Sequence, residues 1–255
     1  MKTALYLIVT NGYDTPIPIP EQFRRGIDCF LFTDDAELTC EGFTTVVVPK
    51  TDDPHRQQRE LKLLIPEQLQ DYDRVIYLDA NIQVLRPLSQ FLAHHKGNIS
   101  MMQHPKRICV YQEGFACMEL NKANPGDIKA QLKRYIDEGI KPGSGMYQTG
   151  MMIRDKCEEV ANFGTIWHDE LQQGTHRDQL SVIAARDRAG IKINAIPYNV
   201  FSQFFKIHPH KPKITPIIHY LQPFAVDKNI GREYNAAIER LQANDGDWVV
   251  ITDYD

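Results

Sequence analysis

The chain has 255 residues, enough to bury a full core, and its 42% hydrophobic and 24% charged content is typical of globular domains. A formal net charge of −4 excludes a chain-wide attraction to nucleic acid or acidic membranes. The five cysteines are scattered and form no Cys-x-x-Cys, which argues against a zinc knuckle or a redox pair and favours reduced thiols in the cytoplasm. No apolar run is long enough to span a bilayer.

The first third of the chain predicts short strands around one helix. Strand signals cover residues 3–9, 29–33 and 46–48, and the first of them runs directly into an Asn-Gly turn, so we interpret it as a strand and not as a signal peptide. Residues 54–70 have a helical pattern that places Arg56, Arg59 and Lys62 on one face. This basic row is either a solvated helix face or a phosphate-binding face, and both interpretations stay open.

The stretch around residue 79 has the strongest functional pattern. An apolar run over residues 75–78 predicts a buried strand that ends at Asp79, Ala80 and Asn81. Hard oxygen ligands at the carboxyl end of a central strand suit Mg²⁺ or Mn²⁺ bound together with nucleotide phosphates. The alternative is a strand that simply ends in an Asx turn.

The remaining segments continue the alternation of strands and helices. We expect helices over residues 89–95, 115–138 with a break near 124–126, 158–172 and 174–188, and strands over residues 99–102, 146–154, 191–196 and 214–220. This alternation predicts an α/β fold with a mostly parallel sheet. The glycines follow neither a dinucleotide-binding nor a P-loop pattern, and no Gly-x-Ser-x-Gly elbow is present.

Four segments in a fixed order carry a family resemblance. They are Tyr77–Ile82, the polar stretch from His104 to Glu113, Gln148–Arg154 and Arg177–Ser181. Together they resemble the bacterial and plant glycosyltransferase-like family formerly filed as a domain of unknown function, which is similar in layout to the glycogenin-type (family 8) retaining transferases. The resemblance implies an α/β fold of the GT-A (Rossmann-like) type, with a mixed, mostly parallel sheet flanked by helices, over residues 1–221.

The resemblance also implies a reaction. It predicts a glycosyltransferase that uses a nucleotide-diphosphate sugar, with UDP as the expected nucleotide and Mn²⁺ or Mg²⁺ as the expected cofactor, and its layout favours a retaining mechanism. Asp79 and Asn81 stand where such enzymes carry an Asp-x-Asp metal motif, and His219 is the expected further ligand. The neutral amide of Asn81 departs from that motif and lowers the charge of the site. A purely structural role for His219 is the alternative.

Site residues follow from the same resemblance. The expected catalytic and sugar-anchoring residues are Asp178, Gln148 and Gln179. The expected donor-binding residues are Thr10, Asn11, Tyr13, Asp34, Arg56, Arg59, Lys62, Asp79, Ala80, Asn81, His104 and Arg107. Two alternatives stay open: Arg177 and Asp178 could be a helix start with a surface charge pair, and His104, Arg107 and Glu113 could form a buried polar network.

Residues 222–255 form a separate C-terminal extension in this interpretation. They predict a helix and then an apolar strand that ends at Asp253 and Asp255, similar to the approach to the metal motif in family-2-type glycosyltransferases. We favour the truncated start of a second transferase domain over a helix and strand that complete the first.

Two other function classes remain as hypotheses. Asn81 in place of a carboxylate is compatible with a catalytically weak nucleotide-sugar-binding module. Asp79 at a strand end would also suit a metal-dependent phosphoryl-transfer or hydrolytic enzyme. The sequence leaves glycan, protein, lipid and modified nucleobase open as acceptors, and it leaves the oligomeric state open.

Overall fold

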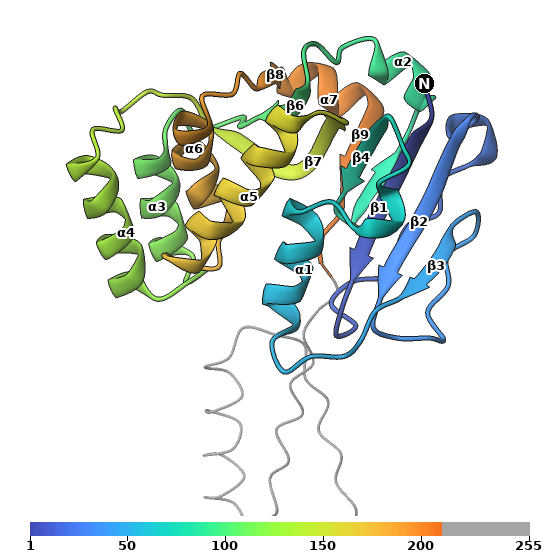
Figure 1. The fold of residues 1–255 in the computed structure, drawn as a ribbon, viewed down its shortest axis with the longest axis horizontal. Helices are drawn as coiled ribbons and strands as arrows, with labels where there is room; N and C mark the ends of the chain where they lie inside the picture. The colour runs from blue at the N-terminus through green and yellow to red at the C-terminus, as the bar shows by residue number, and fades with distance from the viewer. Residues whose placement is uncertain (211–255) are drawn as a thin grey trace, which may run out of the picture. The chain divides into compact units, whose positions relative to one another are not determined.

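A computed structural model of the protein describes residues 1–210. Met1–Pro209 form one compact unit built on a seven-stranded sheet with the strand order β3-β2-β1-β4-β7-β6-β8 (Figure 1). A short antiparallel ribbon of two further strands, β5 and β9, accompanies it. The strands are β1 (Thr3–Val9), β2 (Ile27–Thr33), β3 (Thr44–Val47), β4 (Arg74–Leu78), β5 (Ile82–Val84), β6 (Ile99–Gln103), β7 (Tyr147–Asp155), β8 (Asn194–Ile196) and β9 (Phe205–Ile207).

The sheet is mixed and mostly parallel, because β7 alone runs against its neighbours. The pairs β1–β2, β2–β3, β1–β4 and β6–β8 are parallel, whereas β7 is antiparallel to both β4 and β6. The carboxyl ends of β1, β2, β4 and β6 therefore meet the amino end of β7 at one edge of the sheet. Parallel α/β sheets bind their ligands at this edge. The predicted fold class is confirmed.

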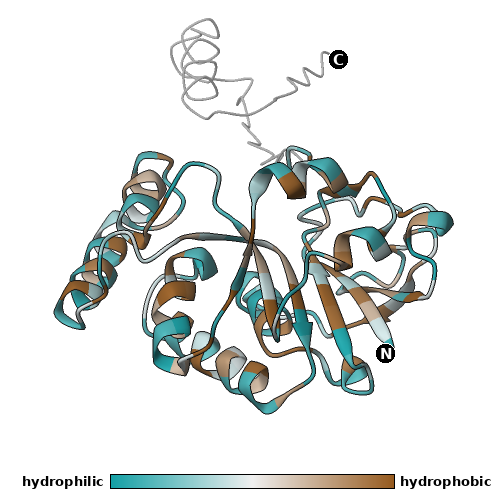
Figure 2. Ribbon diagram, turned by 90° about the horizontal axis from the view of Figure 1, so that it is seen from above, coloured by the Kyte–Doolittle hydropathy of each residue, from teal (hydrophilic) through white to brown (hydrophobic). Residues whose placement is uncertain are grey.

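Helices cover both faces of the sheet and give the molecule two hydrophobic clusters. On one face, α1 and α3 to α6 pack against side chains such as Tyr6 and Tyr77, and on the other, α2, α7 and the ribbon pack against Leu5 and Leu78. The strands are largely hydrophobic, and the helices carry hydrophobic and hydrophilic sides (Figure 2). The helices are α1 (Pro54–Leu63), α2 (Leu88–Leu92), α3 (Val110–Glu119), α4 (Pro125–Asp137), α5 (Glu158–Gln172), α6 (Asp178–Ala189) and α7 (Tyr198–Phe204).

Several predicted boundaries differ from the structure. The helix expected over residues 54–70 ends at Leu63, because Ile65 adopts a left-handed φ of 49° and Pro66 follows it. The helix expected to start near residue 115 begins at Val110, so part of the polar stretch from His104 to Glu113 belongs to α3. α7 and β9 were not predicted.

Some expectations concern residues that the structure does not describe. The strand over 214–220, the domain boundary after 221 and the extension over 222–255 all lie outside residues 1–210 and stay predictions. All five cysteines lie inside that range and are free. No helix among residues 1–210 combines the length and hydropathy needed to cross a membrane.

Candidate active site

Asp79 stands at the carboxyl end of β4 and is held in place from two sides. Its Oδ1 accepts a hydrogen bond of 2.5 Å from the Tyr77 hydroxyl, and its backbone N–H donates to the Gly150 carbonyl at 2.8 Å. A Cβ at Gly150 would lie 2.7 Å from Asp79 Oδ2, so only glycine leaves room for this carboxylate. The Asp79 side chain is 32% exposed and thus remains accessible to a ligand.

Helix α1 brings two of the three predicted basic residues to this edge. Asp53 caps the helix by accepting from the Arg56 N–H at 2.9 Å, and Pro54 occupies the first turn. Lys62, only 2% exposed, places Nζ 2.6 Å from Asp178 Oδ2 and 3.8 Å from Asp79 Oδ1. Arg59 Nε lies 3.5 Å from Asp178 Oδ1. The solvated-face interpretation is therefore wrong for Arg59 and Lys62, whereas Arg56 is exposed.

Asp178 is the first residue of α6 and is buried between α1 and β7. Its Oδ2 accepts from the Thr149 hydroxyl at 2.9 Å and from Lys62, while Arg59 contacts its Oδ1. Burial alone would raise the pKa of the Asp178 carboxyl, but the charges of Arg59 and Lys62 outweigh burial and hold this pKa well below its usual range. The surface charge pair considered as an alternative is wrong, because the Asp178 side chain is 4% exposed.

A second polar cluster begins where β6 ends. His104 Nδ1 accepts from the backbone N–H groups of Lys106 and Arg107 at 3.1 and 2.8 Å, and its Nε2 lies 3.9 Å from the Glu113 carboxylate, to which Arg107 also donates. Burial, with the charges of Arg107 and Lys106, lowers the pKa of His104 to about 4. His104 is therefore neutral near pH 7 and carries its proton on Nε2. The buried-network interpretation of these residues is confirmed.

Three buried polar atoms of residues near the carboxyl edge of the sheet lack a hydrogen-bond partner among the described residues. They are His104 Nε2, Gln148 Oε1 and Arg177 Nε, which come from the end of β6, the start of β7 and the residue before α6. Buried polar groups without partners are uncommon and indicate where a ligand or an ordered water supplies the missing bond. Two of these atoms are donors and one is an acceptor, and a ligand or an ordered water would complete their hydrogen bonds.

The loop after β1 adds an aromatic row. The Asn11 N–H donates to both oxygens of Asp34, and the Thr10 hydroxyl donates to the Pro54 carbonyl at 3.1 Å, which ties the loop to α1. Beyond it, the rings of Tyr13, His55 and His176 follow one another at centroid distances of 6.1 Å. Burial and the charge of Asp14 raise the pKa of Tyr13. The charges of Arg59 and Arg177 lower this pKa and the charge of Asp79 raises it, so the row borders the charged site.

Comparison with known proteins assigns the chain to a family. A family model described as "TOD1/MUCI70, glycosyltransferase-like domain" matches residues 46–210, a range that includes α1, β4, β7 and the start of α6. The chain belongs to this family. The resemblance expected from the four segments is thereby confirmed.

Two individual proteins show how far the similarity extends. The probable hexosyltransferase MUCI70 of Arabidopsis thaliana is 25% identical over 154 residues, which cover 56% of this chain and 26% of that protein. The chain thus matches about a quarter of the length of this curated relative. The solved apo structure of the WbbM bifunctional glycosyltransferase has a TM-score of 0.48 and 10% identity, and the match covers 76% of this chain and 38% of the WbbM chain.

The metal ligands expected for this family member are only partly assembled by the described residues. Asp79 offers a carboxylate, but the Asn81 side chain is 6% exposed and donates through Nδ2 to the His208 carbonyl at 2.6 Å. Ala80 is buried beside them, and His219 lies outside residues 1–210. Within residues 1–210 no group of three or more His, Cys, Asp or Glu side chains could hold a metal ion. Among residues 1–210 Asp79 offers an accessible carboxylate, and the expected ligand set of Asp79, Asn81 and His219 stays a prediction.

Several residues of the site were not predicted. Thr149 and Tyr77 lay within the quoted segments but were treated as strand residues, although Tyr77 shares a strand face with Asp79 two positions later. Arg177 also lay within a quoted segment, whereas His55 and His176 gave no spacing signal, since their role depends on the approach of α1 to the start of α6. Gln179 is half-buried in the first turn of α6, where it was expected to act.

Proposed function

We propose that this chain transfers a sugar from a nucleotide-diphosphate donor, UDP-linked in the first instance, to an acceptor. The observation that carries the proposal is the buried Lys62 ammonium, which lies between Asp178 and Asp79 at the carboxyl edge of the parallel strands. Membership of a glycosyltransferase-like family supports the reaction class. The hexosyltransferase name of the Arabidopsis thaliana relative supports a hexose as the transferred sugar.

In this proposal the cations of α1 stabilise the leaving diphosphate. Arg59 and Lys62 project from one side of α1 toward the edge and are held there by Asp178. A departing diphosphate develops negative charge, and fixed cations in a partly buried site stabilise that charge more than water would. The aromatic row of Tyr13, His55 and His176 borders the same edge and would contact the base.

The sugar would be held by Asp178 and by the residues with unpartnered polar atoms at this edge of the sheet. An ionised carboxylate accepts hydrogen bonds only, so Asp178 would receive sugar hydroxyls as donors. Gln148 Oε1 would accept from a further hydroxyl, and His104 Nε2 and Arg177 Nε would donate, which would satisfy the three unpartnered atoms. Gln179 in the first turn of α6 would approach the reacting carbon, in keeping with the proposed retaining mechanism.

Metal assistance is also part of the proposal, and among residues 1–210 it rests on the carboxylate of Asp79. Asp79 would hold Mn²⁺ or Mg²⁺ together with diphosphate oxygens, and such an ion would add Lewis-acid stabilisation of the leaving group. Arg59 and Lys62 supply cationic charge independently of any ion. The five free cysteines support the cytoplasm as the proposed location.

Donor turnover without an acceptor tests the proposal. Hydrolysis of UDP-, GDP-, CMP- and dTDP-sugars is followed by release of the nucleotide, with Mn²⁺ or with a chelator, for the wild type, Asp79→Ala and Asp155→Asn. Asp155 is the matched control, since it pairs with Arg74 and lies at the opposite end of β4 and β7. We expect turnover of one nucleotide class that Asp79→Ala abolishes and Asp155→Asn retains.

Other outcomes of the same panel would replace the proposal. Binding of a nucleotide sugar without release of nucleotide, with or without added acceptors, would favour a binding module. Release of phosphate from simple esters without any need for a nucleotide sugar would favour a phosphoryl-transfer or hydrolytic enzyme. A wild type that neither binds nor turns over any nucleotide sugar would contradict the proposal outright.

A further inference from the structure

Arg154 is a buried cation that the proposed reaction does not use. It lies on β7 and is 2% exposed, and it forms no ion pair with any carboxylate among residues 1–210. Its Nη1 donates to the Leu63 carbonyl at 3.0 Å, and its Nη2 donates to the Tyr6 hydroxyl. An uncompensated buried charge is costly, so these acceptors must carry the compensation.

The compensation comes from the carboxyl end of α1. The last carbonyls of a helix have no partner further along the helix, and they carry the negative end of its dipole. α1 ends at Leu63, and Arg154 satisfies the Leu63 carbonyl there. Tyr6 completes the arrangement, because its hydroxyl donates to the Lys62 carbonyl at 3.2 Å and lies 3.4 Å from the Leu61 carbonyl.

The same helical turn carries Lys62, whose side chain enters the candidate active site. Its backbone carbonyl is held by Tyr6, while its Nζ lies 2.6 Å from Asp178 and 3.8 Å from Asp79. Burial raises the pKa of Tyr6, so this hydroxyl keeps its proton and continues to donate to the helix end. The backbone position from which the Lys62 ammonium reaches the site is therefore fixed by buried groups outside the site.

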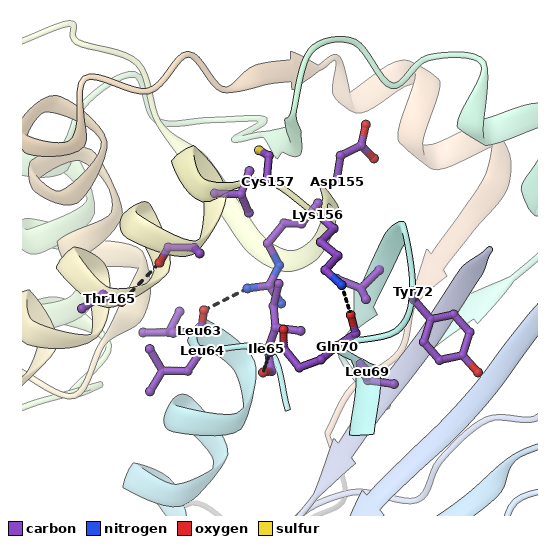
Figure 3. Close-up of a pocket in the computed structure, with 14 residues that line it drawn as sticks. Leu63, Leu64, Ile65, Leu69, Gln70, Tyr72, Asp155, Lys156, Cys157 and Thr165 are labelled. Atoms are coloured by element: carbon purple, nitrogen blue, oxygen red, sulfur yellow. Dashed lines mark hydrogen bonds between the residues drawn. The ribbon is translucent and has the colours of Figure 1, made fainter. Parts of the chain in front are cut away.

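A cavity and a close contact with α5 both border the end of α1. Leu63, Leu64 and Ile65 line a cavity of about 150 Å³, and the bond to the Leu63 carbonyl is visible in the close-up (Figure 3). A Cβ at Gly164 of α5 would lie 2.6 Å from the Leu63 carbonyl oxygen, so α5 contacts this end of α1 closely.

We propose that Arg154, acting through Tyr6 and the last carbonyls of α1, is the positioning residue for Lys62. The strand β7 then serves the site at both ends, since Thr149 near its start donates to Asp178 and Arg154 near its end holds the helix that carries Lys62. The inference rests on the proposed function in one respect, namely that Lys62 contacts the donor diphosphate. Arg154 itself does not touch the proposed donor site.

The first test is a double-mutant cycle on nucleotide binding. The UDP-sugar selected by the turnover panel is titrated calorimetrically into the wild type, Arg154→Met, Lys62→Met and the double variant. We expect Arg154→Met to weaken binding at least ~10-fold in the wild-type background and less than ~2-fold once Lys62 is absent. Equal losses in both backgrounds would overturn the proposal.

Arg74→Met is the matched control for this cycle. Arg74 lies at the start of β4, at the same end of the sheet as Arg154, and its Nη2 donates to Asp155 at 2.9 Å. No contact among the described residues links Arg74 to α1. Its removal is expected to change affinity less than ~2-fold in either background. Arg154→Lys keeps the positive charge with a single donor group. We expect it to bind more tightly than Arg154→Met, whereas the two variants would bind equally if Arg154 only filled space.

A second measurement does not depend on the donor. Amide hydrogen exchange of the last turn of α1 is compared between the wild type, Arg154→Met, Tyr6→Phe and Arg74→Met. We expect faster exchange at Leu63 and Leu64 in Arg154→Met, a smaller increase in Tyr6→Phe and no change in Arg74→Met. If the wild type binds no nucleotide sugar, the proposed function fails while this measurement still tests the positioning. Unchanged exchange in both Arg154→Met and Tyr6→Phe would overturn it.

Discussion

Two buried carboxylates of this molecule, Asp178 and Glu170, each meet a pair of cations but in different settings. Glu170 on α5 is 0% exposed and accepts from Arg134, from Arg188 and, at 2.6 Å, from the Tyr135 hydroxyl. Burial would raise the pKa of Glu170, but the hydrogen bonds from Arg134, Tyr135 and Arg188 lower it, as Arg59 and Lys62 do for Asp178. The local chemistry of the two carboxylates is therefore similar.

The difference lies in what else the cations contact. Arg134 and Arg188 also bind Glu138, at 3.3 and 2.7 Å, so the Glu170 cluster is closed and links α4, α5 and α6. Lys62 instead lies between the buried Asp178 and the partly exposed Asp79 at the edge of the sheet. A closed ion-pair network stabilises a fold, whereas an open one beside unpartnered polar atoms can exchange its contacts for a ligand's.

The largest expected effect is the loss of stability on removing the closed network's charge. Glu170→Gln leaves two arginines without their shared carboxylate and is expected to lower the free energy of unfolding by about 3 kcal/mol. Denaturant unfolding measures this loss. The half-exposed Glu138→Gln is the control and is expected to cost less than about 1 kcal/mol. Turnover per folded molecule should be unchanged in both, and a large loss of turnover in Glu170→Gln would break the contrast.

Asp178→Asn is expected to have the opposite profile. It removes the negative charge and one of the two acceptor oxygens that hold Lys62, Arg59 and the proposed sugar hydroxyls. Turnover of the donor should therefore fall at least ~100-fold, which corresponds to about 2.7 kcal/mol in the activation barrier. Steady-state kinetics measure this fall in turnover, without denaturant and at a temperature at which the variant is folded. If kcat stays within twofold of the wild type, Asp178 is structural in the same sense as Glu170.

The pH dependence of stability tests the neutral state of His104. Its pKa in the folded protein, about 4, lies below the usual value of 6.5, so the unfolded chain takes up a proton first and stability falls as the pH drops through this window. We expect a loss of about 2 kcal/mol between pH 7 and pH 5 from this residue. His104→Asn keeps a backbone-bonding acceptor without a titrating ring, and it should flatten that part of the profile. An unchanged profile would contradict the assignment.

The smallest expected effect concerns the contact between Gly150 and Asp79. Gly150→Ala places a Cβ 2.7 Å from Asp79 Oδ2 and is expected to cost about 1.5 kcal/mol in unfolding free energy while displacing the carboxylate. In an Asp79→Ala background the contact is gone, so the same change should cost less. Equal costs in the two backgrounds would show that Asp79 does not occupy this position.

Local sequence patterns were sufficient for the elements that form the sheet edge. The continuous apolar run of β1 and the run of β4 that stops at Asp79 are typical of strands covered on both faces, and their parallel order follows from the alternation with helices. The helical spacing of the basic row indicated Arg59 and Lys62, the resemblance added Asp178, and the structure brings the three together.

What could not be predicted depends on contacts between segments far apart in the chain. Nothing near Asn81 reveals that its amide is bound by the His208 carbonyl, which lies 127 residues away. The early end of α1 depends on the left-handed Ile65, a residue type that rarely adopts such a φ, so periodicity extended the helix too far. The role of Arg154 likewise depends on a helix end that only the folded chain places beside β7.

The most direct test of the central claim is the affinity of a nucleotide-diphosphate sugar for a variant without the Lys62 ammonium. Calorimetric titration is carried out on the wild type, Lys62→Met and Lys133→Met, the last being a control at a lysine whose side chain is 75% exposed on α4. We predict at least ~10-fold weaker binding for Lys62→Met and unchanged binding for Lys133→Met. Equal affinity of all three proteins would contradict the assignment of this edge as the donor site.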